Sequence, residues 1–208
     1  MIWVPRPFSM AKVLDFLAEF LLVFLIVFTP LAYGAVHPWA IGIFEISAAL
    51  MFLFTFFRIL CADGIKILSV PLYLFALIFI AYVSFQLFFS LYFPLNDCRS
   101  FPGSVYAWST KTELLKLIAY FFIFFSVSNL IRTHRRVNRI LFFIIGTGFV
   151  MGIFYLVRYF GIPAPRGLIN KDHYSGYLAM VVCVALGFLF VPIAEHGRES
   201  HRSSPHFM

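Results

Sequence analysis

Long apolar stretches alternate along the chain with short polar breaks. About six of these stretches reach roughly 20 residues, the length that a helix needs to cross the hydrocarbon of a bilayer. Their apolar positions are continuous and do not alternate with polar ones, which excludes the strands of a porin-like barrel. The pattern predicts helices at about 13–33, 38–60, 68–93, 112–131, 137–160 and 174–194, followed by a polar tail at 195–208.

The composition indicates that the bilayer is the solvent of these helices. Hydrophobic residues make up 62% of the 208 residues and charged residues 12%, whereas soluble domains contain about 45–50% apolar residues. A soluble fold of this length would lack the polar surface needed to cover so many apolar side chains. We therefore predict an all-α, polytopic transmembrane helical bundle that forms a single membrane domain, with the lipid bilayer as a partner.

The first stretch has a second interpretation as a cleaved signal peptide. Arg6 and Lys12 form a basic start, and Ala32 and Gly34 provide small residues at a cleavage-like spacing. The apolar stretch is longer than the ~7–15 residues of a signal peptide core. Its length favours a retained helix.

The net charge of +7 is spread over the breaks between apolar stretches. That distribution determines membrane orientation, so no nucleic acid is expected as a partner. Ten of the 16 Lys and Arg residues fall on one side, which predicts that both termini and the tail are cytoplasmic. The dense group at 132–139 has a lipid-headgroup or partner site as its alternative interpretation. The ten residues are Arg6, Lys12, Arg58, Lys66, Arg132, Arg135, Arg136, Arg139, Arg198 and Arg202.

The cysteines and histidines predict neither a metal site nor a cofactor. Cys61, Cys98 and Cys183 are far apart and odd in number. They lack the close pairs of zinc sites, and they do not form a disulfide framework.

Two acidic residues lie near the cytoplasmic end of the first predicted helix. Ionisable groups are costly in hydrocarbon and are usually paired or face the protein interior. Lys12 can reach Asp15, and Glu19 follows one turn later. We interpret these acids as structural.

Four further ionisable residues belong to the outer half of the membrane: Glu45, Glu113, Lys116 and Arg158. Glu45 lies about two turns inside the second predicted helix, counted from its outer end. One interpretation is a set of intramembrane ion pairs. The other is an outward-facing polar cavity in which Lys116 and Arg158 meet an anionic ligand. The sequence leaves both open.

The densest polar stretch, at 166–177, precedes and begins the sixth predicted helix. Asn170 or Asp172 can cap that helix, which leaves backbone N–H groups and the positive end of the helix dipole facing outward. Such an end suits a phosphate or pyrophosphate group. The alternative is a capped helix start with interfacial tyrosines. The predicted substrate-binding residues are Glu45, Lys116, Arg158, Arg166, Asn170, Lys171 and His173.

Three segments resemble the O-antigen ligase and polymerase-like membrane protein family. They are Gly-Ala-Val-His-Pro-Trp at 34–39, Glu-Leu-Leu-Lys-Leu-Ile-Ala-Tyr at 113–120 and Asn-Lys-Asp-His-Tyr-Ser-Gly-Tyr-Leu at 170–178. The third is similar to the family's Asn-x-Asn-His-Phe-Ala-Gly-Tyr-Leu stretch. Asp172, Tyr174 and Ser175 depart from it.

The resemblance implies glycan transfer from a polyprenyl-pyrophosphate donor, at the outer face of the bacterial inner membrane, in lipopolysaccharide or other cell-surface polysaccharide assembly. The acceptor would be lipid A–core or another glycan repeat, with no metal or cofactor. In such a reaction arginines hold the departing pyrophosphate and a base activates the acceptor hydroxyl. Arg158, Arg166 and Lys171 would hold the donor. The catalytic residue stays unknown, with His173 a weak candidate for the base.

Family members carry more helices and a later outer loop with the catalytic histidine and arginine. The chain resembles their amino-terminal half, so we expect a truncated or split form whose missing helices come from a second chain. Whether the chain is an active enzyme alone stays open. The alternatives are a non-catalytic membrane partner subunit and a small transporter-like helical bundle, the latter marked by polar groups at membrane depth.

Overall fold

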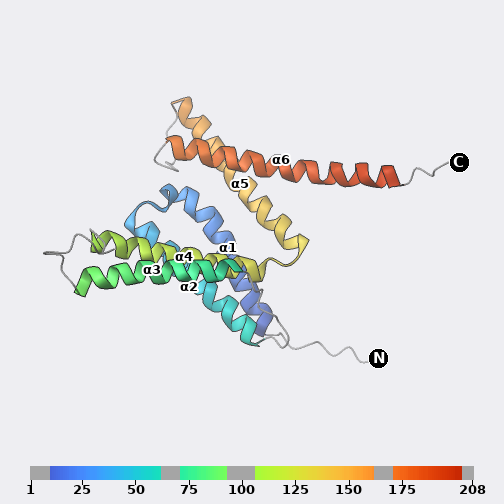
Figure 1. Ribbon diagram of the computed structural model, residues 1–208. Coiled ribbons are helices and arrows are strands. Elements are labelled where there is room, and N and C mark those ends of the chain that lie inside the picture. Colours follow the sequence, from blue (N-terminus) through green and yellow to red (C-terminus); the bar gives the residue numbers. More distant parts are fainter. Residues whose placement is uncertain (1–9, 62–70, 93–105, 162–170, 203–208) are drawn as a thin grey trace, which may run out of the picture. The chain divides into compact units, whose positions relative to one another are not determined.

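The computed structural model describes residues 10–61, 71–92, 106–161 and 171–202, with residue 33 and the segments 171–173 and 191–202 described by their backbone. These residues form six α-helices and one short 3-10 helix (Figure 1). In chain order they are α1 (Met10–Leu31), η1 (Tyr33–Ala35), α2 (Pro38–Cys61), α3 (Pro71–Tyr92), α4 (Ala107–Leu130), α5 (His134–Tyr159) and α6 (Lys171–Arg202).

The predicted all-α fold and its six helices are confirmed, with differences at the helix ends. The fourth helix begins at Ala107 and not at 112, and α6 continues to Arg202, through most of the segment predicted as a polar tail. Apolar patterning marks the part of a helix that lies in lipid. It cannot mark polar turns that extend the same helix into water.

Four of the described helices, α2 to α5, are long and apolar enough to cross a membrane. Within α6 a shorter apolar stretch covers Tyr174–Phe190. Large apolar side chains are widely exposed on all four long helices, as expected where lipid and not protein surrounds them. The chain therefore has the character of a helical membrane protein. The orientation with both termini in the cytoplasm stays a prediction.

The chain divides into two compact units. Unit 1 comprises Met1–Leu22 and Ile41–Arg132, and unit 2 comprises Val23–Ala40 and Thr133–Met208. The boundaries fall inside α1 and α2 and between α4 and α5. No linker-like stretch in the sequence predicted a division, because the breaks between its helices are all short. The single membrane domain stays a prediction.

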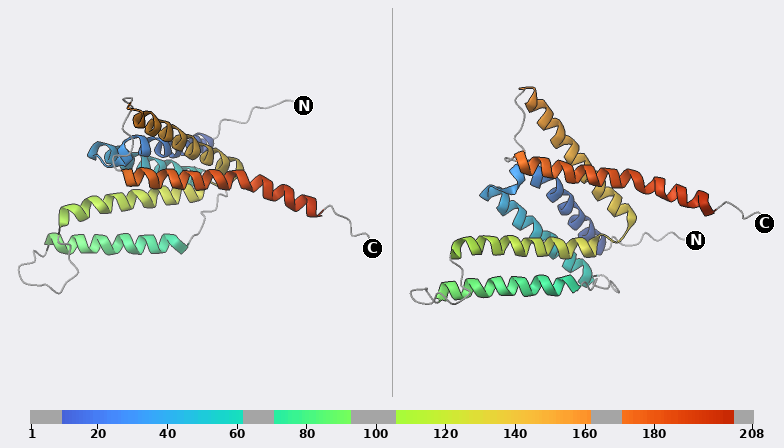
Figure 2. Two further views of the ribbon diagram at one scale, coloured as in Figure 1. Left: turned by 90° about the horizontal axis from the view of Figure 1, so that it is seen from above. Right: turned by 45° about the horizontal axis from the view of Figure 1, so that its top comes forward.

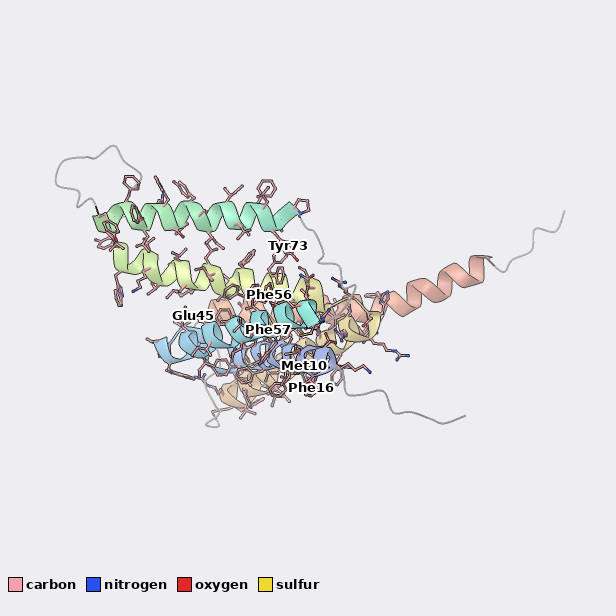
Figure 3. All side chains as sticks on the ribbon, turned by 90° about the horizontal axis from the view of Figure 1, so that it is seen from below. Met10, Phe16, Glu45, Phe56, Phe57 and Tyr73 are labelled. Atoms are coloured by element: carbon pink, nitrogen blue, oxygen red, sulfur yellow. The ribbon has the colours of Figure 1, made fainter. Side chains whose placement is uncertain are left out.

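In unit 1, α3 and α4 lie side by side and antiparallel (Figures 1 and 2). Tyr73, at the start of α3, is directed toward α4 (Figure 3). Its ring meets Phe124, near the end of α4, edge to face with ring centroids 5.3 Å apart. An edge-to-face pair of this kind contributes about 0.5–1.5 kcal/mol beyond its buried area.

Aromatic pairs also join α2 to α4. Phe44 meets Tyr120 with ring centroids 5.7 Å apart, and Phe52 stacks on Phe122 at 4.4 Å. Residue numbers rise together along both helices, so α2 and α4 run parallel. Because α3 is antiparallel to α4, the direction of the chain alternates from α2 to α4, as successive membrane crossings require.

In unit 2, α5 and α6 pack antiparallel. Tyr155 of α5 stacks on Tyr174 of α6 with ring centroids 5.2 Å apart, and further along Gly148 contacts Val181. A Cβ added at Gly148 would lie 2.4 Å from Val181 Cγ1. The missing side chain at Gly148 therefore allows the two helices to approach closely, as small residues commonly do between membrane helices.

Candidate functional site

The region that carries most of the predicted donor site is the junction of α5 and α6 in unit 2. Arg158 lies exposed in the last turn of α5, one turn after Tyr155, whose ring stacks on Tyr174 in the first turns of α6 with ring centroids 5.2 Å apart. Tyr174 is buried, and its hydroxyl donates a hydrogen bond to the backbone oxygen of Met151. The guanidinium of Arg158 and the beginning of α6 therefore share one end of unit 2.

The end of α5 follows from a glycine three residues after Arg158. Gly161 has a φ of 77°, and its N–H bonds the carbonyl of Arg158 at 3.0 Å. Glycine adopts this left-handed conformation at no steric cost and is the usual residue just past a helix end. A cation in the last turn of a helix is also favoured by the negative end of the helix dipole. Local sequence thus fixes Arg158 at the end of its helix.

The other members of the predicted donor site are not tested. Lys171 and His173 stand in the first turn of α6, where the backbone alone is described. Arg166 and Asn170 lie outside the described residues. The capping of α6 by Asn170 or Asp172, the anion-binding role of Arg166 and Lys171, and the candidacy of His173 as a base all stay predictions.

Lys116 forms an ion pair within its own helix. Its Nζ lies 2.7 Å from Glu113 Oε1, one turn away on α4, and the two side chains are 27% and 63% exposed. This contact agrees with the ion-pair interpretation of these two residues. Lys116 would have to exchange Glu113 for a ligand in order to bind an anion. An exposed pair of this kind stabilises a fold by about 1 kcal/mol or less, so the exchange costs little.

Glu45 lies half-buried on α2 (labelled in Figure 3). Within the described residues its carboxylate has no hydrogen bond or ion pair. The preceding residue, Phe44, contacts Tyr120 of α4, one turn after Lys116. Glu45 and Lys116 belong to unit 1 and Arg158 to unit 2, so a common cavity for the three residues stays a prediction.

The segment at 34–39 has a structural explanation in unit 2. Gly34 has a φ of 70° in the turn that follows α1, a conformation that glycine adopts freely. Pro38 occupies the first position of α2, which suits its fixed φ and missing N–H. Trp39 meets Phe28 edge to face at 6.1 Å. These contacts explain the turn without a ligand.

Unit 1 contains a largely buried polar cluster that no pattern in the sequence predicted. The sequence predicts Arg58 as one of the cytoplasmic charges that set topology, but the structure buries its side chain. Its Nη1 donates to Asp15 Oδ1 at 2.7 Å and its Nη2 to the backbone oxygen of Asn129 at 3.3 Å. The side chain of Asn129 donates in turn to the hydroxyl of Tyr73 at 3.3 Å, and Arg132 donates to the oxygen of that side chain at 3.3 Å. We call Asp15, Arg58, Tyr73, Asn129 and Arg132 the Arg58 cluster.

The Arg58 cluster connects four helices near one end of each. Asp15 lies near the start of α1, Arg58 near the end of α2, Tyr73 near the start of α3, and Asn129 near the end of α4. The structure pairs Asp15 with Arg58 at 2.7 Å, a partner that the sequence did not predict. The pairing of Arg58 with Asp15 could not be predicted from the sequence, because a basic residue near a helix end also fits a topology signal.

The cluster holds opposite charges in a hydrogen-bonded pair and contains no thiol or imidazole. Its chemistry is that of a structural connection, and the candidate for ligand binding remains the exposed end of unit 2 at Arg158.

No family model matches the chain, and comparison with curated proteins and with solved structures found no match either.

Proposed function

We propose that the chain is an O-antigen-ligase-like membrane protein of cell-surface polysaccharide assembly, which binds a polyprenyl-pyrophosphate-linked glycan at the outer face of the bacterial inner membrane. The observation that carries the proposal is the position of Arg158. It is exposed at the end of α5, one turn after Tyr155, whose ring stacks on Tyr174 within the stretch that resembles the family.

The chemistry of the donor explains why this arrangement suits it. When the glycan is transferred, the bond between the anomeric carbon and the pyrophosphate oxygen breaks, and the pyrophosphate departs with the electron pair. Cations and backbone N–H groups that already point at the departing oxygens stabilise that charge. Arg158 supplies a planar guanidinium that can bind a phosphate through two N–H groups. The start of α6 supplies free N–H groups and the positive end of a helix dipole.

In this proposal Arg166 and Lys171 complete the cationic side of the donor site, and Asn170 or Asp172 caps α6. His173 is the candidate base for the acceptor hydroxyl.

Binding of a polyprenyl pyrophosphate to the full chain in nanodiscs tests the proposal. We expect Arg158→Ala to raise the Kd about 10- to 100-fold, since a charge-assisted hydrogen bond contributes about 1.5–3 kcal/mol. Arg135→Ala is the matched control, because Arg135 is an exposed arginine at the opposite end of the same helix. Equal Kd values for the two variants at matched folding would contradict the donor site.

A further inference from the structure

We propose that α3 is the surface through which two copies of this chain associate in the membrane, with Gln86 and Tyr82 at the centre of the contact. Among the residues of α3 none is buried. Its contact with α4 engages one side, as Tyr73 shows, and large apolar side chains cover the rest of its surface. Lipid tails can cover apolar side chains, so exposure by itself requires no partner.

The feature that requires more than lipid is a polar pair deep in this helix. Gln86 Nε2 donates a hydrogen bond to the hydroxyl of Tyr82 at 2.9 Å, and Tyr82 is 50% exposed. Tyr82 stands 11 residues after Pro71 and 10 before Tyr92, the two ends of α3. At 1.5 Å per residue it lies about 15 Å from either end, near the middle of a crossing helix.

The pair leaves hydrogen-bonding capacity unused. A carboxamide has two N–H donors and an oxygen that accepts. Among the described residues, the Gln86 side chain forms a hydrogen bond with Tyr82 only. Lipid tails offer no partner for the remaining groups. Polar side chains at such depth commonly form hydrogen bonds between neighbouring membrane helices.

The side chains around the pair form a seam suited to helix packing. Phe75, Phe79, Tyr82, Gln86 and Phe89 follow one another at spacings of 4, 3, 4 and 3 residues. That spacing places them on one side of α3 and is the spacing of residues that interdigitate between two helices. Polar side chains within such a seam can fix the register and the number of helices that associate.

A second copy of the chain fits this seam for two reasons. The carboxamide both donates and accepts, so two Gln86 side chains related by a two-fold axis can bond each other reciprocally. The sequence of α3 also contains no charged residue, so two copies of the helix do not repel each other. A second copy carries the same seam at the same depth in the bilayer. This inference does not depend on the proposed function.

Cysteine cross-linking of the full chain in membranes tests the contact. The native cysteines Cys61, Cys98 and Cys183 are replaced by serine, and one cysteine is introduced at Phe79 within the seam. We expect Phe79→Cys to give a disulfide-linked dimer on mild oxidation. Ser84→Cys is the control, because Ser84 is exposed on the opposite side of α3, about 200° from Gln86. Equal dimer yields from the two positions, or cross-links of Phe79→Cys to a different protein alone, would overturn the proposal.

The affinity of association tests the role of Gln86. Energy transfer between labelled copies in liposomes, measured over a range of protein-to-lipid ratios, gives the dimer Kd. We expect Gln86→Leu to raise this Kd about tenfold, Gln86→Asn to raise it less, and Ser84→Leu to leave it unchanged. The helical content of all variants is compared by circular dichroism, because these changes on an exposed helix should leave each chain folded. A chain that stays monomeric at every ratio, or a Kd that Gln86→Leu leaves unchanged, would refute the contact.

Discussion

The guanidinium of Arg58 and the carboxylate of Asp15 form a hydrogen-bonded ion pair of 2.7 Å, although 43 residues separate them along the chain. The two side chains are 7% and 21% exposed. Bringing two charges out of water is costly, and the cost is offset when they pair closely and make further hydrogen bonds. Arg58 meets this condition, because it also donates to Asn129 of α4.

Removing Arg58 should therefore destabilise unit 1 strongly. Arg58→Ala leaves the carboxylate of Asp15 without this cation, and loss of one partner from a buried pair costs about 3–5 kcal/mol. Unfolding of the purified protein in mixed micelles by a denaturing detergent measures the change. The exposed arginine variant Arg135→Ala is the control and should unfold as the wild type does.

A double substitution separates the pair from its surroundings. Arg58→Met combined with Asp15→Asn removes both charges and keeps much of the packing. We expect the double variant to be more stable than the sum of the two single changes predicts, because neither charge is left unpaired. Strict additivity would show that the two residues contribute independently.

The close approach of α5 and α6 predicts a size limit at Gly148. Gly148→Val places new atoms against Val181, where an added Cβ already lies at 2.4 Å, and overpacking of this kind costs about 1–3 kcal/mol. Thermal unfolding in detergent measures the loss, and Val181→Ala in the same chain should recover part of it.

Gly152 provides the matched control, since a Cβ there would meet no atom within 4 Å. Gly152→Ala should be neutral or slightly stabilising, because alanine favours a helix over glycine by about 1 kcal/mol. If Gly148→Val proves as harmless as Gly152→Ala, the packing of α5 on α6 differs from that described.

The accessibility of Glu45 distinguishes a watery cavity from a lipid-facing position. In a chain without its native cysteines, Glu45→Cys should react with a water-soluble, membrane-impermeant thiol reagent added from outside. Thiolates form in water and not in hydrocarbon. Ile46→Cys, at the exposed apolar neighbour, should not react. Protection of both positions would mean that Glu45 does not face an outward cavity.

The predicted orientation can be checked with the native cysteines. Cys98 lies outside the described residues, in the predicted outer connection between the third and fourth helices. Cys61 is exposed at the end of α2, on the predicted cytoplasmic side. An impermeant reagent applied to intact cells should label Cys98 and spare Cys61. Strong labelling of Cys61 would show that the orientation is the reverse of the predicted one.

The helices could be predicted because the bilayer imposes their length and apolar character on each stretch separately. The contacts between helices could not be predicted, since the sequence of one apolar stretch does not show which other helices it will contact. Arg58 illustrates the difficulty, because its place near a helix end suits both a topology signal and a buried pair. The place of Arg158 near a helix end could be predicted, because α5 ends at Tyr159, just before Gly161.

Tyr174 is one of the residues at which the stretch at 170–178 departs from the family's pattern, which has a phenylalanine there. The contact that its hydroxyl makes explains this difference. A hydroxyl added within a binding motif would normally suggest a change in ligand specificity. Here that hydroxyl is engaged inside the protein, on the backbone of Met151, so it adds no new hydrogen-bonding group for a ligand. A phenylalanine at this place would keep the ring and lose one bond between helices.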